Sequence, residues 1–433
     1  MYYKLFLLLI LLTIYSDSPL QIPLSYFGRT FIPVVVFPLY FFMKARDAMQ
    51  IDDPFLDKYQ KLLKYTIGIS LFALIVCLLF DFGMTHLGEF LPFKMIKLIL
   101  IYFSYYIYII VLVNLANELT LKQIFQPFFF CLIIITVIAF VEVYVGESFF
   151  NSLHFGDAAD REWDYNRVRL LCSESSFTAP LIEIFLGFSL YYSHVINKTN
   201  INRIVTYVCG GLLLITTGSK TLMFAMGIAL LYTYFYLNRG QINGKRLIQI
   251  CFFVVVYLLY LFVVPTLESS LTRDIQESTS TVTRSYTVLM GYIIGTLSIL
   301  GTGFQSYIVF FPEALNRGLG IIDLYMADAN LSEIGEYIFA ESGQNIGAKS
   351  FLAQSSMYWG IFGTIHFVKS YWKVFSDLEL QSLFEKVIFG SLNLIILFQL
   401  LFSADMDYIV LAMLSTFIIL KNKNYDANYS SEV

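Results

Sequence analysis

Apolar stretches about as long as a bilayer is thick recur along the whole chain. A helix needs about 20 consecutive apolar residues to cross the hydrocarbon core, and its backbone groups must be satisfied internally while it does so. Twelve segments meet or approach this length: residues 2–16, 28–43, 62–82, 96–116, 126–146, 176–196, 203–217, 220–237, 247–265, 351–370, 384–402 and 406–421. The sequence therefore predicts an all-α polytopic membrane protein with about 12 transmembrane helices in a single domain, residues 1–433.

Four of these segments are less certain as separate spans of full length. The first two are short, and residues 203–237 can also be read as one long helix. We favour a break at 216–220, Thr-Thr-Gly-Ser-Lys, because a glycine and a lysine in mid-bilayer are costly unless they mark a turn. The run 5–15 resembles a signal peptide, but no small-residue cleavage pattern follows it, so we interpret it as the first span.

The composition excludes a soluble globular protein. Hydrophobic residues make up 58% and charged residues 14% of the chain, against roughly 45–50% and about 25% in soluble domains. The net charge of −4 gives no basis for nucleic-acid binding. The five cysteines form no metal-binding or disulfide pattern, and the sequence carries no motif for nucleotide hydrolysis, zinc catalysis or a serine hydrolase.

The basic residues predict an orientation, because cytoplasmic loops carry the excess of lysine and arginine. With twelve spans and a cytoplasmic N-terminus, 17 of the 28 basic residues fall on the cytoplasmic side. Both termini are then cytoplasmic. Two long polar segments, 147–175 and 266–350, fall on the external face, where loops of this length are usually functional or disordered. Residues 286–300 within the second are apolar but short and glycine-containing, which predicts a helix at or dipping into the membrane surface.

The external face gathers cations beside carboxylates. Arg167 and Arg169 precede Glu174 at the entrance of a span, Lys220 lies in a turn between two apolar runs, and Arg284 precedes the surface helix. Arginine binds phosphate oxygens bidentately and keeps its proton, so such a cluster suits a diphosphate whose lipid tail lies in the bilayer. Glu174 is the first candidate for a base toward an acceptor hydroxyl. Three alternatives stay open: the arginines snorkel to the interface, the lysine contacts lipid headgroups, and the glutamate only orients an arginine.

Four segments resemble the Wzy-type oligosaccharide repeat-unit polymerases, which are relatives of the O-antigen ligases. They are Arg-Val-Arg-Leu-Leu-Cys-Ser-Glu-Ser-Ser-Phe at 167–177, Thr-Gly-Ser-Lys-Thr at 217–221, the stretch from Arg284 to Gly-Thr-Gly-Phe at 301–304, and the stretch from Ala-Lys-Ser at 348–350 to Trp-Gly-Ile-Phe-Gly at 359–363. Ligases of this group typically carry a histidine ahead of the re-entering helix, where this chain has Lys349 and Ser350. That departure favours a polymerase over a ligase.

The resemblance implies a reaction and a set of site residues. A glycan on undecaprenyl diphosphate is transferred to the next lipid-linked repeat unit outside the cytoplasmic membrane, with no cofactor and no metal. The lipid bilayer and the lipid-linked oligosaccharide are the partners, and a chain-length regulator is compatible with this family. The residues carried over are Glu174 and Arg284 as catalytic residues, and Arg167, Arg169, Lys220 and Lys349 as substrate-binding residues. A lipid-linked oligosaccharide flippase and an O-antigen ligase are the alternatives.

Overall fold

The computed structural model describes most of the chain as helices. The described residues are 1–18, 20, 28–46, 53–145, 168–172, 178–217, 222, 227–229, 231–233, 279–325, 331–339, 343, 346–380 and 382–431. The predicted span 247–265 lies outside them, as do most of the predicted span 220–237 and most of the predicted loop 147–175. Arg167, Glu174 and Lys220 also lie outside the described residues.

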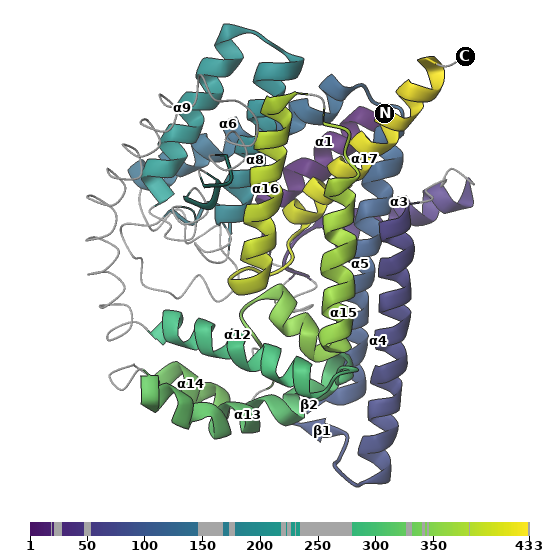
Figure 1. The fold of residues 1–433 in the computed structure, drawn as a ribbon, viewed down its shortest axis with the longest axis vertical. Coiled ribbons are helices and arrows are strands. Elements are labelled where there is room, and N and C mark those ends of the chain that lie inside the picture. The colour runs from purple at the N-terminus through teal and green to yellow at the C-terminus, as the bar shows by residue number, and fades with distance from the viewer. Residues whose placement is uncertain are drawn as a thin grey trace, which may run out of the picture.

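Figure 1 shows the described helices, labelled in chain order. Their bounds are α1 Tyr2–Leu11, η1 Leu12–Ile14, α3 Ile32–Ala45, α4 Pro54–Leu79, α5 Leu91–Asn117, α6 Leu121–Val145, α8 Thr178–Tyr191, η4 Tyr192–Ile196, α9 Asn200–Thr217, α12 Thr279–Leu297, α13 Gly303–Tyr325, α14 Ser332–Ile338, α15 Phe351–Ser376, α16 Leu383–Phe402 and α17 Tyr408–Ser431. The strands β1 Thr85–His86 and β2 Glu89–Phe90 form a small antiparallel hairpin between α4 and α5.

The chain is an all-α membrane protein. Among the described helices, five are long and apolar enough to cross a membrane: Pro54–Leu79, Leu91–Asn117, Leu121–Tyr144, Thr178–Ile196 and Leu383–Phe402. Two shorter apolar helical stretches, Tyr2–Ile14 and Ile32–Ala45, precede them. The total of twelve spans stays a prediction.

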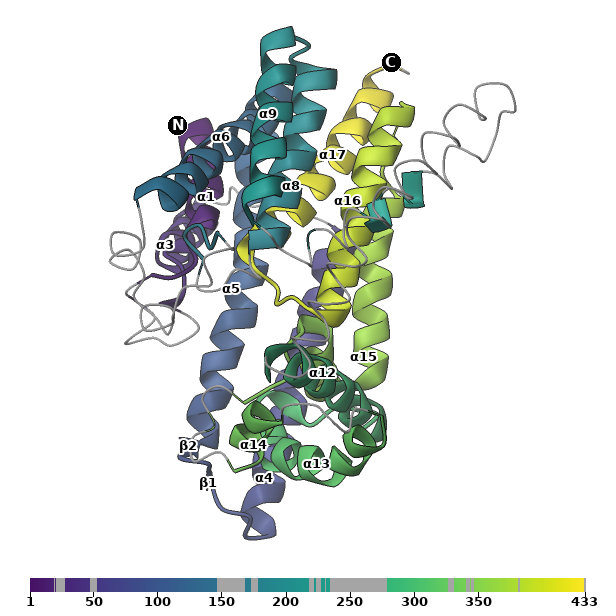
Figure 2. The ribbon, with the colours of Figure 1, turned by 90° about the vertical axis from the view of Figure 1, so that its left-hand side faces the viewer.

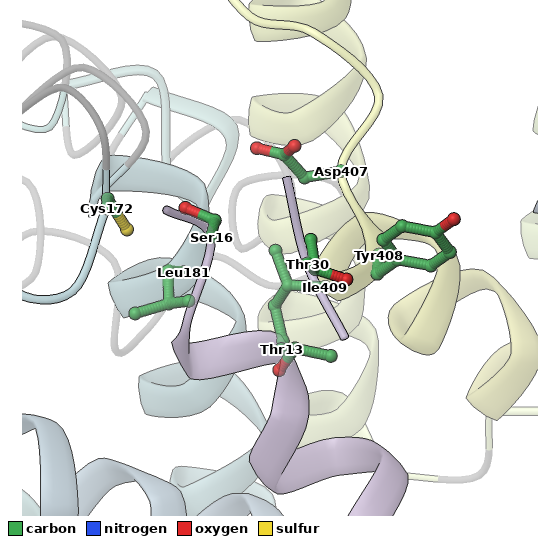
Figure 3. Close-up of a pocket in the computed structure, with 8 residues that line it drawn as sticks. All are labelled: Thr13, Ser16, Thr30, Cys172, Leu181, Asp407, Tyr408 and Ile409. Atoms are coloured by element: carbon green, nitrogen blue, oxygen red, sulfur yellow. The ribbon is translucent and has the colours of Figure 1, made fainter. Parts of the chain in front are cut away.

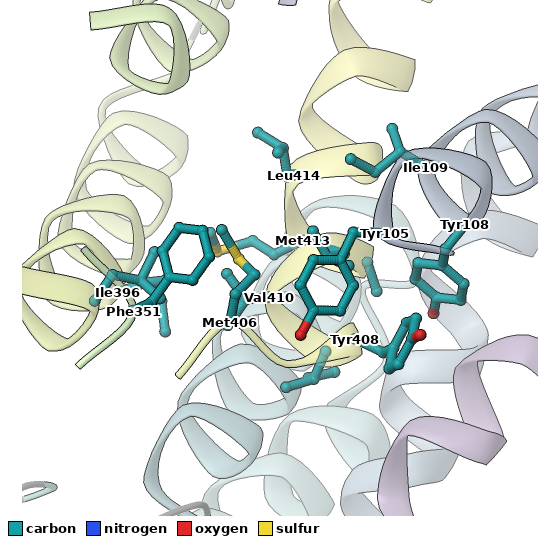
Figure 4. Close-up of a cluster of buried hydrophobic side chains, with 14 of the residues drawn as sticks. Tyr105, Tyr108, Ile109, Phe351, Ile396, Met406, Tyr408, Val410, Met413 and Leu414 are labelled. Carbon is teal, nitrogen blue, oxygen red and sulfur yellow. The ribbon is translucent and has the colours of Figure 1, made fainter. Parts of the chain in front are cut away.

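The helix starts and the core follow from local sequence. Asp53 caps α4 by accepting a hydrogen bond from the Phe55 N–H at 2.8 Å, and Ser382 with Glu385 forms a capping box at the start of α16. Tyr105 and Tyr108 of α5 pack edge to face on Tyr408 of α17, which is buried with them (Figure 4). This aromatic contact joins the early helices of the chain to the last one.

Both ends of the described chain lie at the same end of the molecule (Figure 1). Lys421 of α17 pairs with Asp53 before α4 at 3.0 Å, and the Lys423 ammonium donates to the Asn117 carbonyl at the end of α5. The residues in these contacts come from segments that the sequence places on one side of the membrane. The geometry agrees with termini on a common side, while the assignment of that side as cytoplasmic stays a prediction.

The segment 266–350 is more helical than predicted. Instead of one short helix at 286–300, its described part holds α12, α13 and α14. Among the buried residues of α13, Phe304, Ile308, Phe311 and Leu315 recur every three or four positions, while Glu313 and Arg317 are exposed. A helix that is apolar on one face only gives no continuous apolar run, and for that reason α13 escaped prediction.

Small residues let α12 pack closely against α15. A Cβ atom added at Gly291 or Gly295 would meet Ala353 or Ser356 of α15, with contacts of 3.1 Å and 2.5 Å respectively, and the Ser356 hydroxyl donates to the Gly291 carbonyl at 3.0 Å. Glycine on a helix face allows close backbone approach in membrane proteins. The two helices therefore hold a fixed relation to each other.

The turn after α12 fits into a break in α15. Gly360 has φ 73°, which interrupts α15, and a Cβ there would collide with the Ile299 carbonyl. A Cβ on Gly301, which has φ 89°, would lie 2.6 Å from the Gly360 nitrogen. The Thr302 N–H donates to the Met357 carbonyl at 2.8 Å, a group that the break leaves without its helical partner. Two of the segments singled out in the sequence, 301–304 and 359–363, thus meet in space.

Replacing Gly360 by alanine should destabilise the protein by about 3 kcal/mol or more, because alanine is strained at positive φ and its Cβ has no room. Thermal unfolding of the purified protein in detergent measures the loss. Gly320→Ala on α13 is the matched control, since nothing lies within 4 Å of a Cβ added there. Equal unfolding temperatures for the two variants would contradict the packing of the turn described above.

Candidate functional site

Two of the predicted site residues, Arg284 and Lys349, are joined through Thr287. The Thr287 hydroxyl donates to the Arg284 carbonyl at 3.2 Å and accepts from the Lys349 N–H at 3.4 Å. The Lys349 ammonium lies 3.9 Å from a carboxylate oxygen of Glu333 and 5.3 Å from the centre of the Tyr337 ring. We call Arg284, Thr287, Glu333, Tyr337 and Lys349 the α12–α15 cluster. Its two cations come from positions 65 residues apart in the sequence.

Ser350 anchors this cluster to the rest of the bundle. Its hydroxyl caps α15 by accepting from the Ala353 N–H and donates to the Leu400 and Leu401 carbonyls at the end of α16. The Tyr292 hydroxyl of α12 donates to the same Leu401 carbonyl at 2.7 Å. Lys349 therefore lies beside the N-terminus of α15, where the helix dipole favours an anion.

Arg169 belongs to a second cluster, which is built on other elements. Its side chain is buried, and the backbone N–H groups of Arg169 and Leu170 each donate to one oxygen of the Glu142 carboxylate at 2.8 Å. The next residues pair with the segment after η1: the Ser16 N–H donates to the Leu171 carbonyl at 3.0 Å, and Ser16 forms a bridge with Cys172. The Glu142 carboxylate therefore binds the backbone at Arg169 and Leu170 and fixes the position of these two residues.

Sequence reasoning missed Arg29 and Asp407, which lie in this second cluster. Arg29 is buried and its Nε donates to the Ser16 carbonyl at 3.2 Å. Figure 3 shows Asp407 beside Ser16, Thr30 and Cys172 around a small pocket. Both charged residues fell inside predicted spans, 28–43 and 406–421, but the helices begin later, at Ile32 and Tyr408. A charge at the very edge of an apolar run was the signal that could have revealed them.

The second cluster contains two groups whose pKa values are raised. Burial raises the pKa of Asp407 to about 6, the nearby Arg29 guanidinium opposes this shift, and Asp405 adds to it. Burial also raises the pKa of the Cys172 thiol to about 12, which keeps that thiol protonated and unreactive at neutral pH.

The connection from Ser403 to Asp407, between α16 and α17, borders both clusters. At one end the Ala404 carbonyl accepts from the Phe351 N–H at 2.8 Å, next to Lys349 and Ser350. At the other end Asp407 faces Arg29. Figure 2 shows this connection as a yellow trace through the middle of the molecule, between the end of α16 and the start of α17. Lys349 and Arg29 thus lie near opposite ends of the same five-residue segment, Ser403 to Asp407.

Glu183 is a further carboxyl that sequence reasoning did not select. It is buried inside the apolar helix α8, where one oxygen accepts from the Gln399 amide of α16 at 3.1 Å. Its other oxygen has no hydrogen-bond partner among the described residues. Gln399 also supplies the carbonyl that accepts from Ser403 and Ala404 at the start of the same connection. An ionisable residue inside a span is a candidate functional residue, and a lone glutamate in an apolar run marks it in the sequence.

No three His, Cys, Asp or Glu side chains of the described ranges group as metal ligands would. Among the described cations, Arg284 and Lys349 lie on one side of the connection, and Arg29 and Arg169 lie near its other end. Guanidinium and ammonium groups at helix ends are suited to phosphate oxygens.

Replacing Asp407 by asparagine should stabilise the protein more at pH 7.5 than at pH 5. The folded carboxyl has a pKa of about 6, above its ordinary value of 3.8, so its contribution to stability is present at low pH and is lost as the pH rises through 6. Asparagine keeps the shape and removes the charge, which predicts a gain of a few degrees in unfolding temperature at pH 7.5 and a smaller gain at pH 5, because stability is lost progressively between the unfolded and the folded pKa. Thermal unfolding at both pH values measures it, with the exposed Asp57→Asn variant as control. A gain that is the same at both pH values would contradict the assignment.

Comparison with known proteins yields one distant similarity. No family model matches this chain, and no solved structure matches it. The chain is 22% identical over 207 residues to a Klebsiella pneumoniae protein named "Uncharacterized 49.5 kDa protein in cps region". The alignment covers 47% of this chain and 46% of that protein, so the chain spans about half the length of the curated relative that it matches.

Proposed function

We propose that this protein is a membrane glycosyltransferase that polymerises lipid-linked oligosaccharide repeat units on the external face of the bacterial cytoplasmic membrane. One observation carries the proposal: the Thr287 hydroxyl bonds to the backbone of both Arg284 and Lys349, so that α12 and the segment before α15 meet at a packed junction. The donor is a glycan on undecaprenyl diphosphate, and the acceptor is the next lipid-linked repeat unit. Capsule or O-antigen synthesis is the process that such a reaction serves.

Each of the charged site residues has a role in the proposed reaction. The acceptor hydroxyl oxygen forms a bond to the anomeric carbon of the donor, the bond from that carbon to the diphosphate breaks, and undecaprenyl diphosphate leaves with the bonding pair. Arg284 and Lys349 stabilise the charge that grows on the leaving group. In this proposal the diphosphate is also bound by Arg167, Arg169 and Lys220. A carboxylate accepts the hydroxyl proton, and Glu174 remains the first candidate.

The distant relative supports a role in polysaccharide synthesis. Its name places it in a cps region, the designation of capsule genes. The helical membrane architecture agrees with an enzyme whose substrate has a polyprenyl tail. In this proposal the enzyme uses no cofactor or metal, both termini are cytoplasmic, and a chain-length regulator is a compatible protein partner.

Arg284→Ala should abolish long glycan chains and leave single repeat units on the final acceptor, because the leaving diphosphate loses its bidentate partner. The measurement is the glycan size distribution, by gel electrophoresis, of a deletion strain complemented with the variant. Arg284→Lys should also shorten the chains, since a point charge does not reproduce the planar fork.

The matched control is Arg317→Ala. Arg317 lies on α13, where its exposed side chain pairs with Glu313 one turn away, so its loss should leave chain lengths unchanged. Immunoblots of membranes establish equal amounts of each protein. Wild-type chain lengths in Arg284→Ala would remove this residue from the site, and cytoplasmic accumulation of untransported precursor would favour a flippase instead.

A further inference from the structure

Asp407 lines a small pocket between the N-terminal segment and the start of α17. The polar side chains around this pocket include Thr13, Ser16, Thr30 and Cys172 (Figure 3). Its volume of about 10 Å³ is close to the least that holds one water molecule. The oxygen of a sugar hydroxyl has the same size as that of water, so the pocket can take one hydroxyl group.

Two polar groups at the pocket are open to a ligand. The Ser16 side chain is 7% exposed, and its hydroxyl has no hydrogen-bond partner among the described residues. In the described part of the chain no donor binds the Asp407 carboxyl group. Two carboxylates beside other cations are already bound, because Glu142 accepts two backbone N–H groups and Glu333 faces the Lys349 ammonium. Asp407 therefore keeps the capacity to accept a hydrogen bond or a proton.

The position of Asp407 connects this pocket with the α12–α15 cluster. Asp407 ends the connection from Ser403, in which the Ala404 carbonyl accepts from the Phe351 N–H beside Lys349. Three residues of extended chain span at most about 11 Å, so the backbone at Asp407 lies within that distance of Ala404. A donor diphosphate near Lys349 and an acceptor hydroxyl at Asp407 can therefore belong to one site.

We propose that Asp407 is the general base of the glycosyl transfer, an inference that rests on the proposed function. The Asp407 carboxylate accepts the proton of the acceptor hydroxyl while that oxygen bonds to the anomeric carbon. Undecaprenyl diphosphate leaves with the electron pair of the bond that breaks, and Asp407 then passes its proton to water. The Ser16 hydroxyl orients the acceptor hydroxyl by a hydrogen bond. In this inference Asp407 takes the role for which the sequence offered Glu174.

The surroundings of Asp407 give its carboxyl group the basicity that this role needs. Burial raises its pKa to about 6 from the ordinary value of 3.8, Asp405 adds to the increase, and the Arg29 guanidinium opposes it. A general base works best when its pKa lies near the working pH. An aspartate with its ordinary pKa is a weaker base. The other charged or titratable groups in the segments around the pocket are Asp17, Glu142, Arg169, Cys172 and Tyr408.

The pH dependence of polymerisation by the purified full-length protein tests the proposal. The substrate is the undecaprenyl-diphosphate-linked repeat unit extracted from a strain that lacks this protein, and initial rates are measured in nanodiscs between pH 5 and 8.5. The wild-type kcat should rise about tenfold per pH unit below pH 6 and level off above it, because the base must be deprotonated. Asp407→Asn should lower kcat by about 10²–10⁴-fold, leave KM nearly unchanged and remove the inflection.

Three further variants separate base catalysis from a structural role. Asp405→Asn should move the inflection toward lower pH and keep the maximal kcat, because the loss of this negative charge lowers the pKa of Asp407. Glu174→Gln should keep the inflection near pH 6. Asp57→Asn, at the exposed start of α4, should have the wild-type profile. Since Asp407→Asn is expected to be more stable than the wild type at pH 7.5, unfolding would not explain its loss of rate.

The outcomes distinguish this inference from the proposed function. An inflection that persists in Asp407→Asn, or one that disappears in Glu174→Gln, would overturn the assignment of the base while leaving the polymerase in place. An inflection that Asp405→Asn does not move would also contradict it. A wild-type protein that joins no repeat units at any pH would overturn the proposed function, and this inference with it.

Discussion

The close approach of two glycine backbones, Gly301 and Gly360, fixes the position of the charged part of the molecule. It seats the α12–α13 turn in the break of α15, and the glycines at 291 and 295 continue the contact along α12. Because both helices are then rigid neighbours, the first turns of α12 must lie beside the residues that precede α15. The hydrogen bonds of the Thr287 hydroxyl to the Arg284 carbonyl and the Lys349 N–H are a consequence of this packing.

Long apolar runs predicted their helices well. The predicted span 384–402 is observed as Leu383–Phe402, and the predicted span 351–370 begins at the first residue of α15. Such runs are enough to predict a helix, because a segment surrounded by protein or lipid has no water to bind its backbone N–H and C=O groups. A helix satisfies these groups within the segment itself. Segments with a polar face gave a weaker signal: α13, which carries Glu313 and Arg317, was predicted as part of a loop.

The candidate site was less predictable because it depends on contacts between distant segments. Arg284, Arg169 and Lys349 could be selected by residue type and by their nearness to predicted spans. Nothing in the sequence indicates that Thr287 joins two of them or that Glu142 binds the backbone of the third. Arg29 and Asp407 were overlooked for a related reason, since a shift of two to four residues in a helix start moves a charge from a span to its mouth.

A polyprenyl diphosphate has a tail that belongs in hydrocarbon and a headgroup that belongs at the membrane surface. Figures 1 and 2 show α12 and α13 lying across the axes of α4 and α15. Arg284 lies 13 residues before Leu297, about 20 Å along α12, so the two positions are separated sideways and not along the axes of those helices. In the proposed reaction, a donor diphosphate bound near Arg284 and Lys349 would therefore have its tail directed along the spanning helices, because that is the direction in which the hydrocarbon lies.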